Sequence, residues 1–296
     1  MSRRHLAFLA VGVVAVSFSS VLIRLADAPP LTVAFWRMAI ASAILLPPML
    51  VRRGEEIRAF ERSQWATAGL AGLLLAAHFA TWVPSLSYIS VGASTVLVTT
   101  QPVWVAVIGR ILGARIARAT VLGIALSLVG AIVIFGRDLG TPDLRGDALA
   151  LLGAVAAAGY FLSGRSLRRR VSLLAYVGVA YTTCAAVLSL VVVFSGEPFL
   201  GLGARAWLLF LLMALGPQIL GHTVFNYLLS DVEPGIIAIA VTAEPVGATL
   251  LAFAFLGEVP PWTAFLGGAL ILAGIWLTIR TAASRVGPEV PAMSVG

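Results

Sequence analysis

The chain is poor in charge and has no lysine. Charged residues make up 11% of its 296 residues, and all 20 of its basic residues are arginines. Soluble domains carry about 25% charged residues, so this sequence lacks the polar surface that a soluble enzyme of this length needs. The one cysteine, Cys184, excludes a disulfide framework.

What is present is mainly apolar. Hydrophobic residues account for 60% of the chain, and the mean hydropathy is +1.01. This composition indicates a polytopic membrane protein, and a membrane-spanning helix needs about 20 apolar residues. The runs are too long and continuous for barrel strands, so helices are expected. Ten helices fit the uncharged or nearly uncharged runs 5–23, 31–51, 63–109 (two spans with a turn at Gly92), 119–136, 148–164, 171–196, 206–230, 234–257 and 259–279.

The positions of the arginines predict the orientation. The net charge of +7 would suit nucleic acid, but the arginines form short clusters between apolar runs, so no nucleic-acid partner is expected. With a cytoplasmic N-terminus, 15 of the 20 arginines fall in cytoplasmic segments and 4 in external ones, while Arg37 lies in a span. This bias predicts a multi-pass protein of a bacterial inner membrane with both termini inside. A signal peptide ending at Ala26-Asp27-Ala28 is the alternative for the first run.

The two halves of the chain resemble each other. The block Leu86–Pro102 matches Leu229–Pro245 at an offset of 143, and Gly12 and Arg24 align with Gly153 and Arg165 at an offset of 141. We therefore expect a first five-helix repeat at 1–137, a linker at 138–145, a second repeat at 146–281 and a tail at 282–296. Five crossings are an odd number, so the second repeat starts on the opposite side and is inverted. Inverted repeats are typical of secondary transporters that work by alternating access, with the substrate near the midplane.

Polar side chains within spans are costly and usually face a bundle interior or an aqueous cavity. Gln218, His222 and Asn226 are spaced i, i+4, i+8 and would share one face, either lining a cavity or joining helices by hydrogen bonds. His78 and Trp82 are also four residues apart. Each histidine could titrate and couple transport to protons, or stay neutral and form hydrogen bonds.

Two prolines stand at mid-span, Pro102 and Pro245, and predict helix kinks. The freed carbonyls could contact a substrate ammonium, or nearby threonines or water could satisfy them. Glu244, the acid well inside a span, could bind an amine, carry a proton, or stabilise the kink as the repeat equivalent of Gln101. Arg37 is expected to be structural, with Asp27 or Gln64 as its partner.

The candidate substrate-binding residues are therefore His78, Trp82, Thr99, Gln101, Trp104, Tyr160, Ser163, Gln218, His222, Asn226 and Glu244. Trp82, Trp104, Tyr160 and Phe225 could form an aromatic pocket that favours planar apolar side chains or a cationic amine. The sequence has no phosphate-binding loop and no catalytic Ser/His/Asp set, so neither an enzyme nor a cofactor is expected. Three histidines and one cysteine do not complete a metal-ligand set, so no metal is expected. The expected partners are a small-molecule substrate and the lipid bilayer.

Several motifs resemble the drug/metabolite transporter superfamily, specifically its EamA-type ten-helix exporters. They are Phe35-Trp36-Arg37, the blocks Leu86–Pro102 and Leu229–Pro245, and Phe255-Leu256-Gly257-Glu258. Leu112-Gly113-Ala114 departs from the family pattern, because it lacks the glutamate often seen there.

The resemblance implies a carrier similar to bacterial exporters of aromatic and other amino acids. Its cavity would be lined by the first, third, fourth, sixth, eighth and ninth helices. The fifth and tenth would lie at the periphery, where they could support a weak homodimer or simply pack on lipid in a monomer. An amphipathic drug efflux carrier, a membrane-embedded enzyme and a non-transporting assembly protein remain as alternatives.

Overall fold

The computed structural model describes residues 2–89, 91–114, 116–135, 143–256, 259 and 262–283, and within these ranges the only regular elements are helices. In chain order they are α1 (Arg3–Ser17), α2 (Ser19–Leu25), α3 (Pro30–Arg58), α4 (Arg62–Ser85), α5 (Val91–Val98), α6 (Gln101–Ile111), α7 (Arg118–Phe135), α8 (Leu144–Arg168), α9 (Leu173–Ser195), α10 (Ala204–Met213), the π-helix η1 (Ala214–Thr223), α11 (Val224–Leu228), α12 (Pro234–Val241), α13 (Glu244–Leu256) and α14 (Trp262–Ala283).

Among the described residues, eight helical segments are long and apolar enough to cross a bilayer, and several of them combine consecutive elements, such as α1 with α2 over Arg3–Leu25. Two shorter apolar helices, Arg118–Val133 and Phe265–Arg280, lie in α7 and α14. The expected all-helical fold is therefore confirmed for the described residues.

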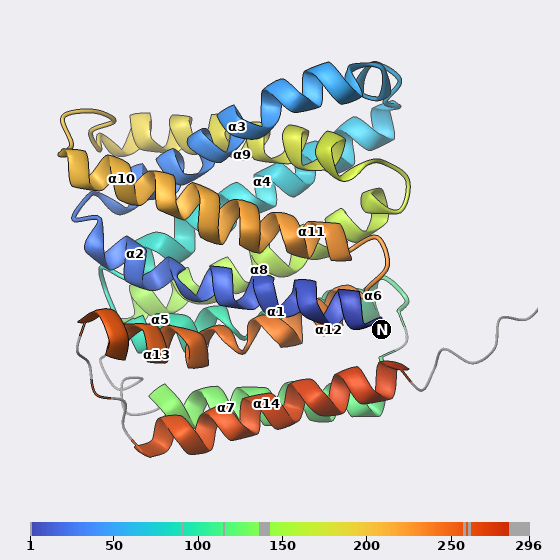
Figure 1. Cartoon of the computed structure of the whole chain (residues 1–296), viewed down its shortest axis with the longest axis vertical. Coiled ribbons are helices and arrows are strands. Elements are labelled where there is room, and N and C mark those ends of the chain that lie inside the picture. The colour runs from blue at the N-terminus through green and yellow to red at the C-terminus, as the bar shows by residue number, and fades with distance from the viewer. Residues whose placement is uncertain are drawn as a thin grey trace, which may run out of the picture.

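The helices run side by side in a layered bundle (Figure 1). α3 packs against α9 at one edge, α4 packs against α8 in the middle, and α7 packs against α14 at the opposite edge. The start of α1 and the connections α3–α4, α8–α9 and α11–α12 lie at one end of the bundle, whereas the connections α2–α3 and α9–α10 lie at the other. Successive segments therefore cross the bundle in alternating directions.

Glycines allow α7 and α14 to approach each other closely. A Cβ atom added to Gly130 would lie 2.5 Å from the carbonyl oxygen of Gly267, and one added to Gly274 would lie 2.5 Å from that of Gly123. Such direct backbone contact is how glycines pack helices in lipid. This glycine face joins the two helices within one chain, so a second copy of the chain could only meet their outer faces.

Two helices are divided just before a proline. α5 ends at Val98 and α6 begins at Gln101 before Pro102, while α12 ends at Val241 and α13 begins at Glu244 before Pro245. Proline lacks the N–H that would bond the carbonyl four residues earlier, and its ring clashes with that carbonyl. Threonine hydroxyls satisfy neighbouring carbonyls: Thr99 Oγ1 donates to Val96 O over 3.0 Å, and Thr242 Oγ1 donates to Ile239 O.

The connection between α4 and α5 differs from the expected turn at Gly92. α4 ends at Ser85, the chain turns over Leu86–Ile89, and Gly92 lies in α5. The hydroxyl of Ser85 donates to Trp82 O over 2.6 Å and lies 2.7 Å from the hydroxyl of Ser94. These bonds end α4 earlier than hydropathy alone indicates.

Candidate functional site

A small cavity of about 40 Å³ lies in the middle of the bundle. At about 10–15 Å³ for each water it has room for only a few water molecules, so a larger ligand requires the cavity to widen. Residues from α1, α2, α4, α5, α6, α8, η1, α11, α12 and α13, together with Thr99, line it: Val16, Ser19, Leu75, His78, Trp82, Val98, Thr99, Gln101, Ala157, Tyr160, Phe161, His222, Phe225, Val241 and Glu244. α7 and α14 contribute none of these, in agreement with the peripheral position that the family resemblance implies.

The structure brings most of the predicted site residues to this cavity. Seven of them line it, namely His78, Trp82, Thr99, Gln101, Tyr160, His222 and Glu244. Trp104, Ser163, Gln218 and Asn226 are not among the lining residues. Ser19, Phe161 and the two valines Val98 and Val241 line the cavity although they were not predicted to.

The aromatic wall of the cavity is built around His78. Its ring stacks on Trp82 with the centroids 5.6 Å apart and an interplanar angle of 15°. The Nδ1 atom lies 2.9 Å from Gly153 O, and a carbonyl can only accept, so Nδ1 is the donor. This bond fixes the tautomer of the neutral ring and leaves Nε2 as its free acceptor.

The two helix breaks meet the cavity at equivalent points. Val98 stands four residues before Pro102, and Val241 stands four residues before Pro245; both line the cavity. Each proline removes the donor that the valine carbonyl would otherwise have. In the described part of the chain, no hydrogen bond to either carbonyl oxygen is found. Glu244, buried at the start of α13, adds a carboxylate to the same cavity.

Three buried polar atoms of the cavity wall are without hydrogen-bond partners among the described residues. They are Trp82 Nε1, Gln101 Nε2 and His222 Nδ1. Leaving a buried polar atom without a hydrogen bond costs about 1–3 kcal/mol. A ligand atom that bonds one of these three atoms would recover that cost. The cavity wall thus combines the carboxyl group of Glu244 with unpartnered polar atoms on α4, α6 and η1.

Arg37 corrects the expectation that it pairs with Asp27 or Gln64. It is 1% exposed; its Nε donates to Gln218 Oε1 over 3.0 Å, and its Nη1 donates to Ser19 Oγ over 2.8 Å. The guanidinium also lies 4.4 Å from the ring centroid of Phe79 and interacts electrostatically with Glu244. Arg37 is not a lining residue of the cavity. Its partners on several helices surround the guanidinium and exclude solvent from it.

The predicted stripe on the eighth span also differs. Gln218 and His222 lie in the π-helix η1, whose wider i→i+5 turns break the i, i+4 register. His222 faces the cavity, whereas Gln218 bonds Arg37. Asn226 Nδ2 donates to Tyr160 OH and, over 3.2 Å, to Tyr181 OH. Gln218 and Asn226 thus hold cavity-forming helices together.

The other two predicted residues also lie outside the cavity. Trp104 Nε1 donates to Thr100 Oγ1 over 3.2 Å, and its half-buried ring packs on the main core. Ser163 is half-buried on α8, and its carbonyl accepts from Ser166 Oγ over 2.9 Å. Within the described residues, no group of three or more His, Cys, Asp or Glu side chains could hold a metal ion.

Comparison with known proteins identifies relatives along most of the chain. The model of the EamA-like transporter family matches residues 4–136 and again 144–280. An uncharacterized transporter of Archaeoglobus fulgidus is 25% identical over 88% of this chain and 92% of its own length. A probable terminal-alkyne amino-acid exporter of Streptantibioticus cattleyicolor is 25% identical over 83% of this chain and 82% of its own.

Two further matches agree with this. The inner membrane transporter YedA of Escherichia coli K12 is 27% identical over 85% of this chain and 82% of its own length. A protein of known crystal structure superposes with a TM-score of 0.80 over 97% of this chain and 100% of that protein, at 19% identity. At this identity the superposition supports the fold alone.

Proposed function

Because the chain belongs to the EamA-like transporter family of the drug/metabolite transporter superfamily, we propose that it exports amino acids or related amine-bearing metabolites across a bacterial inner membrane. The named relatives are transporters rather than enzymes. The observation that carries the proposal is the buried cavity, which Glu244 lines together with Val98 and Val241, the residues four positions before the two prolines.

The substrate chemistry follows from the groups on that wall. An ammonium group is a donor without acceptors, so Glu244 and the two carbonyls are suitable ligands for it. A carboxylate only accepts, so Gln101 Nε2, Trp82 Nε1 and His222 are suitable ligands at the other end of a zwitterion. Rings of Trp82, Tyr160 and Phe225 would stack on an apolar or planar side chain. One relative is itself named as a probable terminal-alkyne amino-acid exporter, which favours this substrate class.

The proposed mechanism is alternating access between two inverted five-helix repeats. In this proposal α7 and α14 also span the bilayer, giving ten spans, residues 1–137 and 146–281 form the repeats, and both termini are cytoplasmic. Two observations support it. The family model matches the chain twice, once in each half. Each half also has one proline-broken helix that reaches the cavity, at Pro102 and at Pro245.

Flux measurements test this function directly. The purified chain is reconstituted into liposomes, and efflux of labelled phenylalanine, leucine and a deaminated analogue of phenylalanine is compared with leakage from empty liposomes. We expect the two amino acids to move and the analogue to move at least tenfold more slowly, because it cannot bond Glu244. If neither amino acid moves faster than leakage, the substrate class is wrong.

A matched pair of variants tests the role of the carboxylate. Glu244→Gln keeps the shape of the side chain and removes its charge, so amino acid flux should fall at least tenfold. Glu55→Gln makes the same change on an exposed residue of α3 and should leave flux unchanged. Repeating the assay with an imposed pH gradient distinguishes proton-coupled export from facilitated diffusion.

The same liposomes test amphipathic drug efflux, which the aromatic wall also favours. A lipophilic cation such as ethidium can stack on the aromatic rings although it has no carboxylate group. If ethidium is transported and the amino acids are not, the function is drug efflux and not amino acid export.

A further inference from the structure

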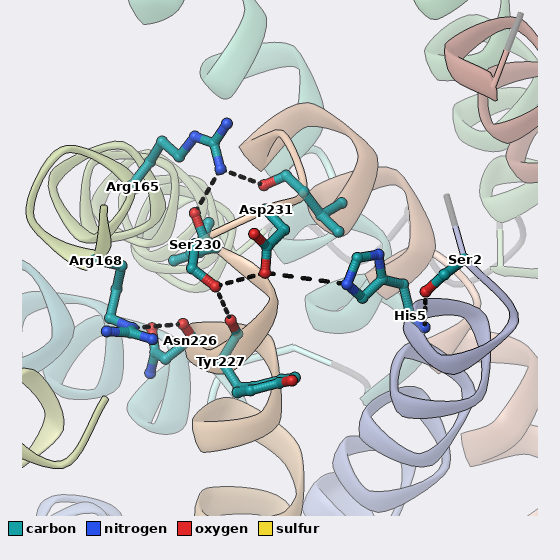
Figure 2. Close-up of polar contacts among 10 residues, drawn as sticks. Ser2, His5, Arg165, Arg168, Asn226, Tyr227, Ser230 and Asp231 are labelled. Atoms are coloured by element: carbon teal, nitrogen blue, oxygen red, sulfur yellow. Dashed lines mark hydrogen bonds and ion pairs between the residues drawn. The ribbon is translucent and has the colours of Figure 1, made fainter. Parts of the chain in front are cut away.

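Two helices hold the turn between α11 and α12 from opposite sides (Figure 2). From α8, Arg165 Nη1 donates to Leu229 O over 2.7 Å and to Val232 O over 3.4 Å. From α1, the His5 ring lies 4.0 Å from the carboxylate of Asp231. At this end of the bundle the turn is therefore fixed to both α1 and α8.

α8 and this turn are in close contact, and a second arginine of α8 adds a hydrogen bond nearby. A Cβ atom added to Gly164 would lie 2.9 Å from Leu229 Cδ1. Arg168 Nε, one turn after Gly164 on α8, donates to Asn226 O over 3.1 Å, as Figure 2 shows. α8 itself packs mainly on α4, α5 and α6, so Arg165 and Arg168 connect that group of helices to α11 and α12.

The turn between α4 and α5, 143 residues earlier, has the same backbone hydrogen bonds. Asp231 N and Val232 N both donate to Leu228 O, over 3.0 and 2.7 Å. At the equivalent positions, Tyr88 N and Ile89 N both donate to Ser85 O, over 3.0 and 3.1 Å. The carbonyls of Leu86 and Ile89 therefore correspond to the two that accept from Arg165.

The residue that corresponds to Arg165 is Arg24, in the last turn of α2. Unlike Arg165, Arg24 is exposed, and no hydrogen bond from it to Leu86 O or Ile89 O is found among the described residues. The α4–α5 turn packs against the start of α8, because a Cβ atom added to Gly146 would lie 2.6 Å from Ile89 Cγ2. Gly146 corresponds to His5, the residue of α1 that contacts the α11–α12 turn. The two turns therefore share this contact, whereas the arginine contact is made only at the α11–α12 turn.

We propose that Arg165 and Arg24 are alternating latches of the two ends of the cavity. This rests on the proposed alternating access. With Arg165 bonded to the α11–α12 turn, that end is closed and the end at Arg24 is open. In the opposite state, Arg24 donates to Leu86 O and Ile89 O, and Arg165 is released. Such a bond is strong, because a charged donor meets carbonyls that have left the helical ladder.

The neighbours of the two arginines differ in charge and set the resting state. Asp231 and Glu233 interact electrostatically with Arg165. At the corresponding positions, 143 residues earlier in the sequence, stand Tyr88 and Ser90, which are uncharged. The latch at Arg165 is therefore the stronger one, and the protein without substrate rests with the α11–α12 end closed.

Distances between spin labels test the latches without any transported substrate. Two cysteine pairs are introduced separately into the Cys184→Ala background: Ser166→Cys with Gly235→Cys, where nothing lies within 4 Å of the Cβ position, across the α11–α12 end, and Asp27→Cys with Ser87→Cys across the α4–α5 end. Arg165→Ala should shift the population toward an open α11–α12 end by roughly tenfold to a hundredfold, the range expected for a lost charged hydrogen bond. The first pair should then move apart and the second pair should approach. Arg165→Lys should retain part of the closed population.

Arg24→Ala gives the second test. This residue is exposed, so its replacement leaves the packed core untouched, and the α4–α5 end should then stay open under all conditions. Arg169→Ala is the matched control, because Arg169 is an exposed arginine that directly follows the last residue of α8. If Arg165→Ala and Arg169→Ala give the same distances, the latch does not exist. If the distances shift but no amino acid is transported, the latch stands and the proposed substrate class is wrong.

Discussion

The guanidinium of Arg37 and the side-chain amide of Gln218 share a hydrogen bond of 3.0 Å across 181 residues of chain. The bond joins α3 to the π-helix η1, directly behind the cavity wall formed by His222. Ser19 and the ring of Phe79 complete the surroundings of the cation, and Glu244 interacts with it electrostatically. Arg37 thus connects α3 to four other segments around the candidate site.

Arg37 and Glu244 should be energetically coupled. Removing one partner of a buried pair of charges costs about 3–5 kcal/mol, because the other charge is left uncompensated. We expect Arg37→Met to lower the free energy of unfolding in detergent by about this amount. The double variant with Glu244→Gln should recover part of the loss, whereas Arg205→Met on an exposed arginine should change little. Additive losses in the double variant would mean that the two charges do not interact.

Two tryptophans test whether the cavity wall takes part in transport, because one lines the cavity and the other does not. Trp82 is 4% exposed, stacks on His78 and lines the cavity, whereas Trp276 is 57% exposed on α14. Trp82→Ala should reduce flux in liposomes at least tenfold, while Trp276→Ala should leave it within twofold of the unmodified protein. Equal effects of the two replacements would reject the assignment of the cavity.

Asn226 and Tyr160 offer a test of the network between α11 and α8. Asn226→Leu leaves Tyr160 OH and Tyr181 OH without their donor, and Tyr160→Phe removes one of these acceptors. For directly bonded residues, a double-mutant cycle should give a coupling energy of about 0.5–3 kcal/mol in unfolding measurements. A coupling near zero would mean that Asn226 does not hold Tyr160 in place.

The packing of α7 on α14 should tolerate no side chain at Gly130. An added Cβ would lie 2.5 Å from Gly267 O and 2.9 Å from Ile271 N, both of which are backbone atoms that cannot rotate away. Gly130→Ala should therefore destabilise the protein by about 1–3 kcal/mol, as overpacking does.

Gly69→Ala is the matched control for that replacement. Nothing lies within 4 Å of the Cβ position at Gly69, and alanine is the better helix former there. Thermal unfolding of the two variants should shift in opposite directions. If both are equally stable, α7 and α14 are not in the close contact described.

Hydropathy placed the long apolar helices close to their observed positions, while the count of ten spans stays a prediction. The run 171–196 corresponds to α9 at Leu173–Ser195, and the breaks at Pro102 and Pro245 follow from the missing donor of proline. The free carbonyls of Val98 and Val241 could have been found in the same way, by counting four residues back from each proline. Helix positions and proline breaks depend on neighbouring residues in the sequence, so the sequence is sufficient to predict them.

Features that depend on contacts between distant segments could not be predicted. The partner of Arg37 is 181 residues away, and nothing near Arg37 in the sequence indicates it. The stripe Gln218, His222 and Asn226 assumed an α-helix, whereas the segment contains a π-helix that includes Pro217. Helical periodicity fixes a face only when the type of helix is known.

The π-helix also makes the spacing of residues along this segment as important as their identity. An α-helix turns by about 100° per residue and rises 1.5 Å, so deleting one residue between Gln218 and Asn226 would barely shorten the segment. It would nevertheless rotate everything beyond by about a quarter turn, carrying Asn226 away from Tyr160 and Tyr181. Deleting one residue here would therefore rotate the part of the cavity wall that follows it. The hydrophobic length that the membrane requires would stay nearly the same.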